Sequence, residues 1–538
     1  MNLSIYSILK ILFYSEQKIS VDSFYMILKK LIKFSVLLFV FGVFSINPAY
    51  AQQQWDWHIA GGTVIDGTGE VPYQADLLIR GDSIGYIGDV DADTIRSEHF
   101  VNASGKVITP GFIDPHAHGD PLETPDFQNF LGMGVTSIVL GQDGSSPDVG
   151  ALNNWFVKVK EASPTVNIAM LSGHGSIRSK VDVGKQDLTQ KELKRMQKLL
   201  QLDLNAGAFG MSTGLEYVPG MYAGESELEK LAKVVGEANG LIMSHMRSED
   251  DSRIEASLNE LAEQGEFASV HASHLKVVYG EGEKRAQEIL HHIDSFRDQG
   301  ITITADVYPY SASFTGIGIV FPDWAKTKSE WQNALQERPE ILRQFLQKKV
   351  AQRNGPGAIL FGSGEFAGLT LEEAAEQENK SAIDLLMEMG PQSASAAHFV
   401  MDQELQDRLM LGKNVMVSSD GSPTMYHPRG YGSFAKMIRY YVNEKELLSL
   451  EEAIYKMSGL PAQTLGLKDR GLLQEGMKAD LLIFNPAKIK DRATFENPHK
   501  LAEGFDWIMV NGTLIREGGE FNEKRNGQIL RNRNASGK

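Results

Sequence analysis

The sequence contains no cysteine among its 538 residues. Disulfide bonds are therefore excluded, and any metal site must use His, Asp, Glu or a modified Lys. Beyond the N-terminal region there is also no basic run, low-complexity tract or fixed-period repeat. The formal net charge is -16, and an acidic chain of this kind repels polyphosphate, so a nucleic acid is not an expected partner.

One continuous apolar run stands near the N-terminus, at Phe34–Phe44. The basic Lys29–Lys33 segment precedes it, and the small-x-small motif Ala49–Ala51 follows. This order is typical of a secretory signal, so we expect residues 1–51 to be removed from an exported, periplasmic protein. The run is too short to span a bilayer comfortably, so no stable membrane insertion is expected after cleavage. An uncleaved anchor is the alternative, and Met26 is an alternative start.

Both ends of the remaining chain have the pattern of short strands separated by glycine-containing turns. Residues 52–110 carry this pattern on the N-terminal side, and residues 466–525 carry it before a polar tail at 526–538. We expect the two segments to form one small β-sandwich domain.

The middle of the chain, residues 111–465, alternates buried strands with helices. Repeated alternation predicts a parallel sheet, and about eight units predict a (β/α)8 TIM-type barrel. The runner-up is an open doubly wound sheet, but no Gly-x-Gly-x-x-Gly turn follows the first strand. Residues 312–398 are too long for a single loop and have helical pieces, which predicts an inserted helical segment over the barrel mouth. The expected strands lie at 111–118, 134–141, 166–173, 209–214, 241–246, 268–276, 301–310 and 414–421.

A His-x-His motif ends the first of these strands, at His116 and His118. Alternate side chains of a strand point to the same face, so both imidazoles can bind one ion. His245, His274 and Asp420 also stand near the ends of predicted strands. Each alone would be an ordinary core or surface residue. Because strand ends converge at one mouth of a barrel, together they predict a divalent metal site of the zinc type.

Two longer motifs of the sequence resemble those of a known family. VITPGFIDPHAHGD (Val107–Asp120) and RGLLQEGMKADLLIFNP (Arg470–Pro486) resemble the amidohydrolase superfamily. Within it, further motifs resemble the D-aminoacylase, or N-acyl-D-amino-acid deacylase, group: GLEYVPGMYA (Gly214–Ala223), SHMRSED (Ser244–Asp250), SHLK (Ser273–Lys276), DVYPY (Asp306–Tyr310) and HPRGYGSF (His427–Phe434). The resemblance implies metal-dependent hydrolysis of the amide bond of N-acyl-D-amino acids.

The chain departs from this family at one position. D-aminoacylases resemble one another in a Gly-Asn-Cys-Gly whose Cys ligates metal, whereas this chain has Gly141-Gln142-Asp143-Gly144. Asp143 is therefore expected as the ligand in place of Cys. A carboxylate is a competent but harder ligand, so one or two Zn²⁺ ions are expected and another divalent metal is an alternative. The other interpretation is that Asp143 caps the following helix.

The resemblance implies a role for each candidate. Asp143, His245 and His274 would hold the main ion, and His116 and His118 a second, weaker one. Asp420 would take a proton from the metal-activated water and pass it to the leaving amine.

The resemblance also implies a substrate-binding set for a small N-acyl amino acid: Lys276, Arg429, Tyr217 and Tyr308. The planar fork of Arg429 suits a carboxylate. His174 and Arg178 are further candidates at the mouth, whereas Glu249 and Asp306 are given no role. The oligomeric state is not predicted.

Other functions remain as alternatives. A dipeptidase or a cyclic-amide hydrolase of the same superfamily is the nearest, although the latter typically carries a carboxylated lysine on the fourth strand, and FGMSTG (Phe209–Gly214) has none. A catalytically inactive, exported binding protein is the alternative from another class, but such relatives usually lose the His-x-His or the final Asp.

Overall fold

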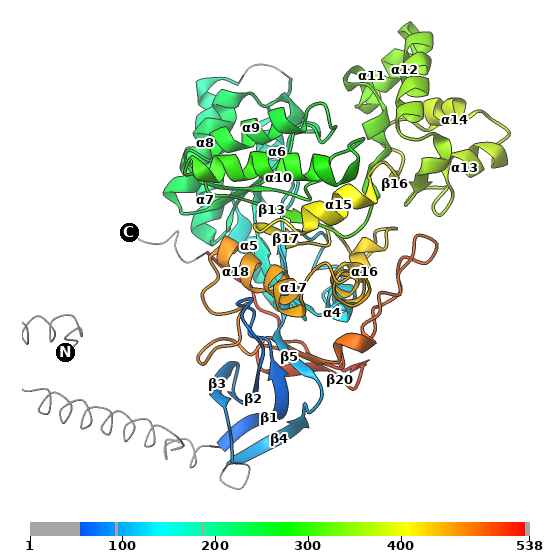
Figure 1. Cartoon of the computed structure of the whole chain (residues 1–538). Coiled ribbons are helices and arrows are strands. Elements are labelled where there is room, and N and C mark those ends of the chain that lie inside the picture. The colour runs from blue at the N-terminus through cyan, green and yellow to red at the C-terminus, as the bar shows by residue number, and fades with distance from the viewer. Residues whose placement is uncertain (1–53, 92–94, 186–187, 533–538) are drawn as a thin grey trace, which may run out of the picture. The chain divides into compact units, whose positions relative to one another are not determined.

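A computed structural model describes residues 54–91, 95–185 and 188–532 (Figure 1). The expected signal segment 1–51 lies outside them. Within the described part of the chain, residues 54–55, 90–91 and 95–98 belong to a small unit and the others to a larger one. In the small unit, the side chain of Gln54 donates a hydrogen bond to Glu98 at 3.2 Å. Apart from residues 54–55 and 96–98, where two strands begin, the features below belong to the larger unit. Among the described residues, no helix is both long and apolar enough to cross a membrane.

Parallel strands form the centre of the larger unit, in two sheets of order β6-β7-β8 and β17-β13-β12-β11-β10-β9. Nearly every residue in them is buried, which explains their continuous apolar sequences. Each strand expected between 111 and 421 contains at least one of them. Their bounds are β6 (Phe112–Asp114), β7 (Val135–Leu140), β8 (Asn167–Met170), β9 (Ser172–Gly173), β10 (Gly210–Gly214), β11 (Leu241–His245), β12 (Ser269–Ala272), β13 (Ile303–Val307) and β17 (Val415–Val417).

Backbone hydrogen bonds join the two sheets at both of their edges. At one edge, Leu171 alone separates β8 from β9, and the N–H of Phe209, which precedes β10, donates to Met170 of β8 at 2.9 Å. At the other, Ala117 and Gly421 form a parallel bridge beyond the ends of β6 and β17. The N–H of His118 donates to the Gly421 carbonyl at 2.7 Å there.

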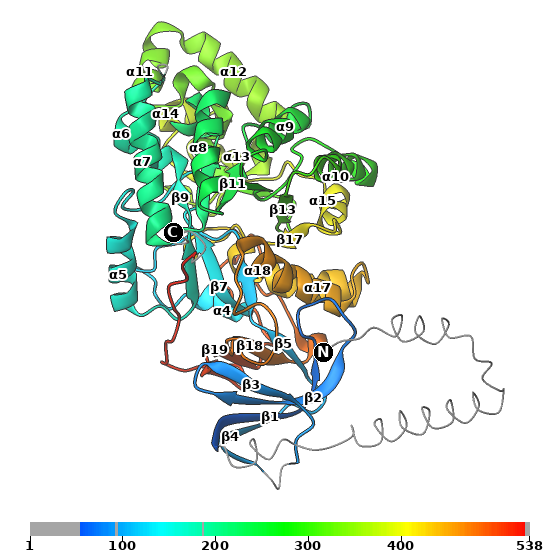
Figure 2. The same ribbon diagram turned by 90° about the vertical axis from the view of Figure 1, so that its left-hand side faces the viewer.

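Helices cover the outside of these strands (Figure 2). The helix α7 shows why they form: Leu193, Met196, Leu200 and Leu204 recur at helical spacing and are buried. A capping box of Thr189 with Glu192 begins this helix. The covering helices are α4 (Gln128–Gly132), α5 (Leu152–Ala162), α6 (His174–Val181), α7 (Gln190–Ala206), α8 (Glu225–Glu237), α9 (Ile254–Gln264), α10 (Gly282–Asp298), α15 (Gln403–Met410), α16 (Arg429–Lys436), η5 (Met437–Glu444), α17 (Leu450–Met457) and α18 (Gly459–Leu465).

A separate nine-stranded sheet combines strands from both ends of the chain, in the order β21-β20-β19-β18-β5-β1-β2-β3, with β4 paired to β1 off this path. The N-terminal and C-terminal parts meet where Val107–Pro110 pairs antiparallel with Leu481–Phe484. The last described residues turn away from this sheet, and Leu530 donates a backbone hydrogen bond to Ile168 of β8 at 2.8 Å. The strands are β1 (Gln54–Val64), β2 (Tyr73–Arg80), β3 (Ser83–Gly88), β4 (Arg96–Asn102), β5 (Val107–Pro110), β18 (Leu481–Phe484), β19 (Trp507–Val510), β20 (Thr513–Glu517) and β21 (Glu520–Phe521).

The expected insertion contains helices and also a three-stranded antiparallel sheet of order β14-β16-β15. It has a hydrophobic core of its own, centred on residues such as Phe321, Leu346 and Phe361. Its elements are β14 (Ser313–Gly316), α11 (Lys328–Glu337), α12 (Pro339–Gln352), β15 (Ile359–Phe361), α13 (Leu371–Gln377), α14 (Ala382–Met389) and β16 (Ser395–His398).

Candidate metal centre

All six side chains expected at the metal centre or as its acid and base stand at or just beyond the carboxyl ends of parallel strands. His245 is the last residue of β11, whereas Asp143, His274 and Asp420 follow β7, β12 and β17. These last three have left-handed backbones, with φ of 54°, 36° and 46°. This conformation costs a non-glycine residue on the order of 1 kcal/mol, and such residues cluster at functional sites.

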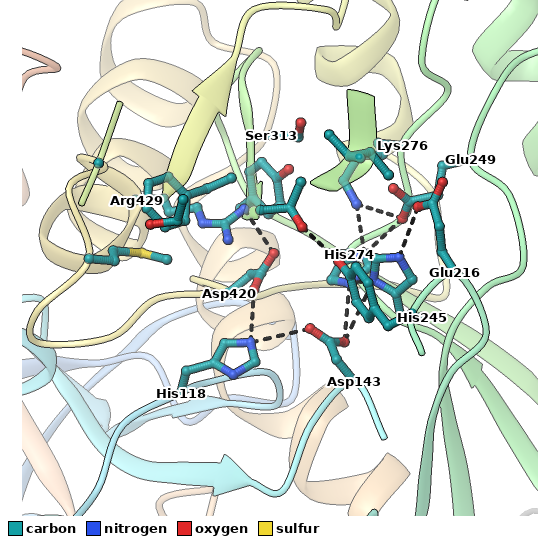
Figure 3. Close-up of a pocket in the computed structure, with 18 of the residues that line it drawn as sticks. His118, Asp143, Glu216, His245, Glu249, His274, Lys276, Ser313, Asp420 and Arg429 are labelled. Carbon is teal, nitrogen blue, oxygen red and sulfur yellow. Dashed lines mark hydrogen bonds and ion pairs between the residues drawn. The ribbon is translucent and has the colours of Figure 1, made fainter. Parts of the chain in front are cut away.

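A first group of donor atoms comes from Asp143, His245 and His274 (Figure 3). His245 Nδ1 lies 2.9 Å from His274 Nε2, and Asp143 Oδ1 lies 3.3 Å from His274 Nε2 and 3.8 Å from His245 Nδ1. Tetrahedral zinc with bonds of about 2.0 Å separates its donor atoms by about 3.3 Å. The first group therefore has the spacing that a zinc ion requires.

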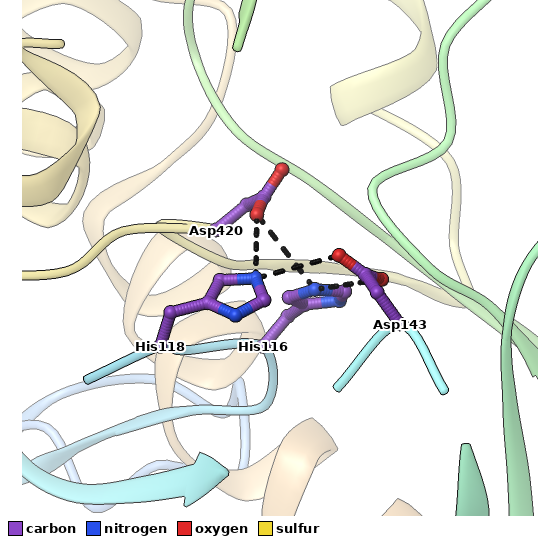
Figure 4. Close-up of side chains that lie close together, drawn as sticks. All are labelled: His116, His118, Asp143 and Asp420. Atoms are coloured by element: carbon purple, nitrogen blue, oxygen red, sulfur yellow. Dashed lines mark hydrogen bonds and ion pairs between the residues drawn. The ribbon is translucent and has the colours of Figure 1, made fainter. Parts of the chain in front are cut away.

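A second group consists of His116, His118, Asp143 and Asp420 (Figure 4). His118 Nε2 lies 3.1 Å from Asp420 Oδ1 and 3.5 Å from Asp143 Oδ2. His116 Nε2 lies 3.4 Å from Asp143 Oδ1 and 3.7 Å from Asp420 Oδ1. The His116 ring is 0% exposed, and neither of its nitrogens forms a hydrogen bond with a described residue. His116 Nε2, a buried nitrogen without a hydrogen-bond partner among the described residues, faces both carboxylates, and this arrangement fits a cation between them.

Asp143 belongs to both groups. Its Oδ1 faces His274 and His116, and its Oδ2 faces His118. The carboxylate that replaces the expected thiolate can therefore bridge two ions. The structure brings the five candidate ligands and Asp420 together.

Two further carboxylates contact the ligand imidazoles from behind, and a third holds the backbone of His274; sequence analysis assigned none of them a role. Glu249 Oε1 lies 3.0 Å from His274 Nδ1, and Glu216 Oε2 lies 3.3 Å from His245 Nε2. Asp306, on β13, contacts His271 at 2.6 Å and accepts a hydrogen bond from the His274 backbone N–H at 3.0 Å. A carboxylate behind an imidazole fixes the ring so that the other nitrogen faces the ion.

The electrostatics of the site favour ionised carboxylates. Burial alone would raise the pKa of Asp143, but the charges of His116 and His274 hold it well below its usual range. Burial likewise opposes ionisation of Asp420, yet Arg429 and then His274 keep its pKa low. The pKa of His116 is lowered by burial but raised more by Asp143, so the net shift is upward. The site therefore attracts positive charge, which a metal ion would supply.

The expected substrate-binding residues line a cavity of about 420 Å³ above these groups. Lys276 Nζ lies 2.6 Å from Glu249 Oε1, and Arg429 Nη1 lies 2.8 Å from Asp420 Oδ2. The Tyr308 ring lies beneath the Arg429 guanidinium, 4.6 Å from ring centroid to Cζ, and the Tyr217 ring packs 4.4 Å from that of His245. All four therefore lie at the site, and both cations are already paired with a carboxylate.

His174 and Arg178, the further candidates for the mouth, are buried and do not line this cavity. His174 Nε2 lies 2.7 Å from Glu227 Oε1, and Arg178 pairs with the same carboxylate. Their network stabilises α6 against α8.

Comparison with known proteins identifies the family to which this chain belongs. Residues 354–516 match the Amidohydrolase family. The chain is 32% identical to the N-acyl-D-glutamate deacylase of Alcaligenes xylosoxydans xylosoxydans over 496 residues, which cover 86% of this chain and 94% of the relative. It is 31% identical to the D-aminoacylase of the same organism over 508 residues, which cover 89% of this chain and 98% of the relative.

A solved structure of N-acyl-D-glutamate deacylase from Bordetella bronchiseptica, complexed with zinc and a phosphonate inhibitor, superposes with a TM-score of 0.78 at 32% identity, covering 89% of this chain and 100% of that one. A crystal structure of D-aminoacylase gives a TM-score of 0.76 at 30% identity, with the same coverage. Fold and site thus define a metal-dependent amidohydrolase. Within that superfamily, the chain belongs to the D-aminoacylase group.

Proposed function

We propose that this protein hydrolyses the amide bond of N-acyl-D-amino acids and releases a carboxylate and a free amino acid. The observation that carries the proposal is the pair of ligand groups that share Asp143 at the base of a cavity. The D configuration is supported by the similar deacylases, which act on N-acyl-D-glutamate and N-acyl-D-aspartate.

The residues fit a zinc site of one or two ions, with another divalent metal as the alternative. Asp143, His245 and His274 would hold the first ion, and His116 and His118 would complete a second around the same Asp143. A bound Zn²⁺ supplies Lewis acidity, polarising the scissile carbonyl and lowering the pKa of water from 15.7 to about 7.

Asp420 would move the proton. Its Oδ1 faces His118 at 3.1 Å, and its Oδ2 is held by Arg429 at 2.8 Å. Because its pKa is low, Asp420 is ionised at neutral pH and can accept the proton of the attacking water. The same carboxyl then donates that proton to the nitrogen of the leaving amino acid as the C–N bond breaks. Arg429 and Lys276, beside the Tyr308 ring, provide the positive charge for its α-carboxylate.

The fold that supports this chemistry is proposed to be a closed (β/α)8 barrel over 111–465. The hydrogen bond of Phe209 with Met170 and the bridge of Ala117 with Gly421 support closure, since they join both edges of the parallel sheets. The insertion at 312–398 would cover the mouth, because Ser313, Phe314 and Ser395 line the cavity. Residues 52–110 and 466–525 would form the small β-sandwich domain, and 526–538 a C-terminal tail.

Export to the periplasm, with cleavage near Ala51, is also proposed from the N-terminal sequence. N-terminal sequencing of the protein purified from the periplasmic fraction tests it. A first residue close to Gln52 supports export, whereas an intact leader on cytoplasmic protein contradicts it.

The function is tested with zinc-loaded protein on N-acetyl-D-amino acids, their L enantiomers, dipeptides and hydantoins. We expect turnover of the D substrates alone. Asp420→Asn should lower kcat on the order of 10²- to 10⁴-fold, with bound zinc and the unfolding temperature unchanged. Hydrolysis of the hydantoins or dipeptides instead would assign the chain to another amidohydrolase activity.

A further inference from the structure

A third cation lines the cavity, and the proposed chemistry does not use it. Arg353 follows α12 in the insertion, and its side chain lines the same cavity as Lys276 and Arg429. Only 4% of Arg353 is exposed. Arg353 is therefore a buried charge whose side chain borders the substrate cavity.

Arg353 differs from the other two cations in its partners. Among the described residues, no carboxylate forms an ion pair with its guanidinium, and its Nε has no hydrogen-bond partner. Its one hydrogen bond to a side chain is long: Nη1 donates to Tyr279 Oη at 3.4 Å. Lys276 and Arg429, by contrast, have carboxylates at 2.6 and 2.8 Å.

No carboxylate of the described residues lies within ion-pair distance of Arg353. Asp250 also lines the cavity and interacts with Arg353 at longer range, but its ion pair is with Lys349 at 3.8 Å, and Glu216 faces His245. His398 is buried with both ring nitrogens unpartnered. Burial, and then the charges of Arg353 and Lys349, keep the pKa of His398 well below its usual range, so its ring is neutral. An unpaired buried charge is costly, and a carboxylate from a ligand would relieve that cost.

We infer that Arg353 binds a second carboxylate of the substrate, so that the preferred substrates are dianionic N-acyl-D-amino acids. This inference rests on the proposed function and adds a subsite to it. The first carboxylate is the α-carboxylate near Arg429, and the second belongs to the amino-acid side chain or to the acyl group. The planar guanidinium suits a carboxylate in two-point contact. The hydroxyls of Ser363 and Ser395 line the cavity as additional polar groups.

The test compares Arg353→Gln with wild type on matched substrate pairs. N-acetyl-D-glutamate against N-acetyl-D-glutamine tests a side-chain source, and N-succinyl-D-leucine against N-acetyl-D-leucine tests an acyl source. Wild type should prefer the dianionic member of at least one pair, and Arg353→Gln should lower kcat/KM for that member by about 10- to 100-fold, as for a charge-assisted hydrogen bond. The neutral member should change by less than about threefold.

Two controls separate recognition from folding. Arg343→Gln removes an arginine of α12, the helix that Arg353 follows, and this arginine is paired with Asp384 at 2.7 Å. The variant should leave the kcat/KM for both members unchanged. Arg353→Lys keeps the charge and should recover part of the preference. An equal loss on both members of the pair, with a lowered unfolding temperature, would mean that Arg353 only stabilises the insertion, and it would overturn the inference.

The inference and the proposed function can fail separately. If wild type hydrolyses neutral N-acyl-D-amino acids with no preference for a second carboxylate, the inference is wrong and the function stands. If the wild-type protein hydrolyses no N-acyl-D-amino acid, the proposed function is wrong, and the inference that rests on it is wrong too.

Discussion

The two ligand groups share Asp143 but differ in what lies behind their imidazoles. In the first group, Glu249 and Glu216 contact the far nitrogens of His274 and His245. In the second, the far nitrogen of His116 is 3.8 Å from Asp306 and makes no hydrogen bond, and His118 is 33% exposed. A ring held from behind loses less entropy when it binds an ion, so the first group should bind the tighter metal.

The largest effect is expected at the residue that both groups share. Asp143→Asn should remove both ions and lower activity by more than about 10³-fold, because each group then lacks its carboxylate. Metal analysis and kcat/KM measure this. Asp148→Asn, at an exposed carboxylate 3.4 Å from Lys158, is the control and should change neither quantity. The alternative that Asp143 caps the following helix is wrong, because α5 begins after Ala151 and has no side-chain cap. A fully active Asp143→Asn would show that Asp143 is not a metal ligand.

The next largest effect is expected when one histidine ligand is removed from each ligand group in turn. His274→Asn should abolish binding of the tighter ion and lower activity on the order of 10³-fold, which exceeds the 10- to 100-fold typical of an outer-shell change. His118→Asn should lose only the weaker ion and stay within about tenfold of wild type. Zinc stoichiometry on the two variants, alongside kcat, tests this. If His118→Asn lowers activity more than His274→Asn does, the first group does not hold the more important ion.

A smaller effect is expected at Glu249, which supports His274 from behind. Glu249→Gln should weaken the tighter ion by about 10- to 100-fold, because the amide no longer supports the ring with a full charge. Competition with a chelator of known affinity measures the change. Unaltered affinity would mean that Lys276, not His274, is the functional partner of Glu249.

The smallest effect is expected at Glu216, which is 25% exposed and 3.3 Å from His245. Solvent screens this contact, so Glu216→Gln should weaken zinc by less than about threefold. The same chelator competition applies. An effect as large as that of Glu249→Gln would show that the two imidazoles are held equally.

Much of this site could be predicted because strand ends converge in any parallel α/β fold. His116, His118, His245, His274 and Asp420 each follow an apolar run, and that pattern is visible in one dimension. The orienting carboxylates were missed because their partners are set by tertiary packing. Asp306 did carry a signal, however: a carboxylate inside a buried strand must be paired, and it lies between His271 and His274.

The fold, like the site, has features that the sequence predicts and features that it does not. Long amphipathic helices such as α7 and the continuous apolar strands were visible in the sequence. The sheet of the insertion was not, since β14, β15 and β16 are only three or four residues long and lack a clear alternation. The pairing of Leu530 with β8 was also missed, because that strand-like contact sits in a segment of mostly polar residues.

The antiparallel pairing of β5 with β18 has a consequence for biosynthesis. One edge of β5 lacks its neighbour until nearly the whole polypeptide has left the ribosome, so the nascent chain carries an open β edge during most of translation. A product truncated before Leu481 would keep that edge open permanently and invite aggregation. Premature stop codons late in the gene should therefore be almost as damaging as early ones.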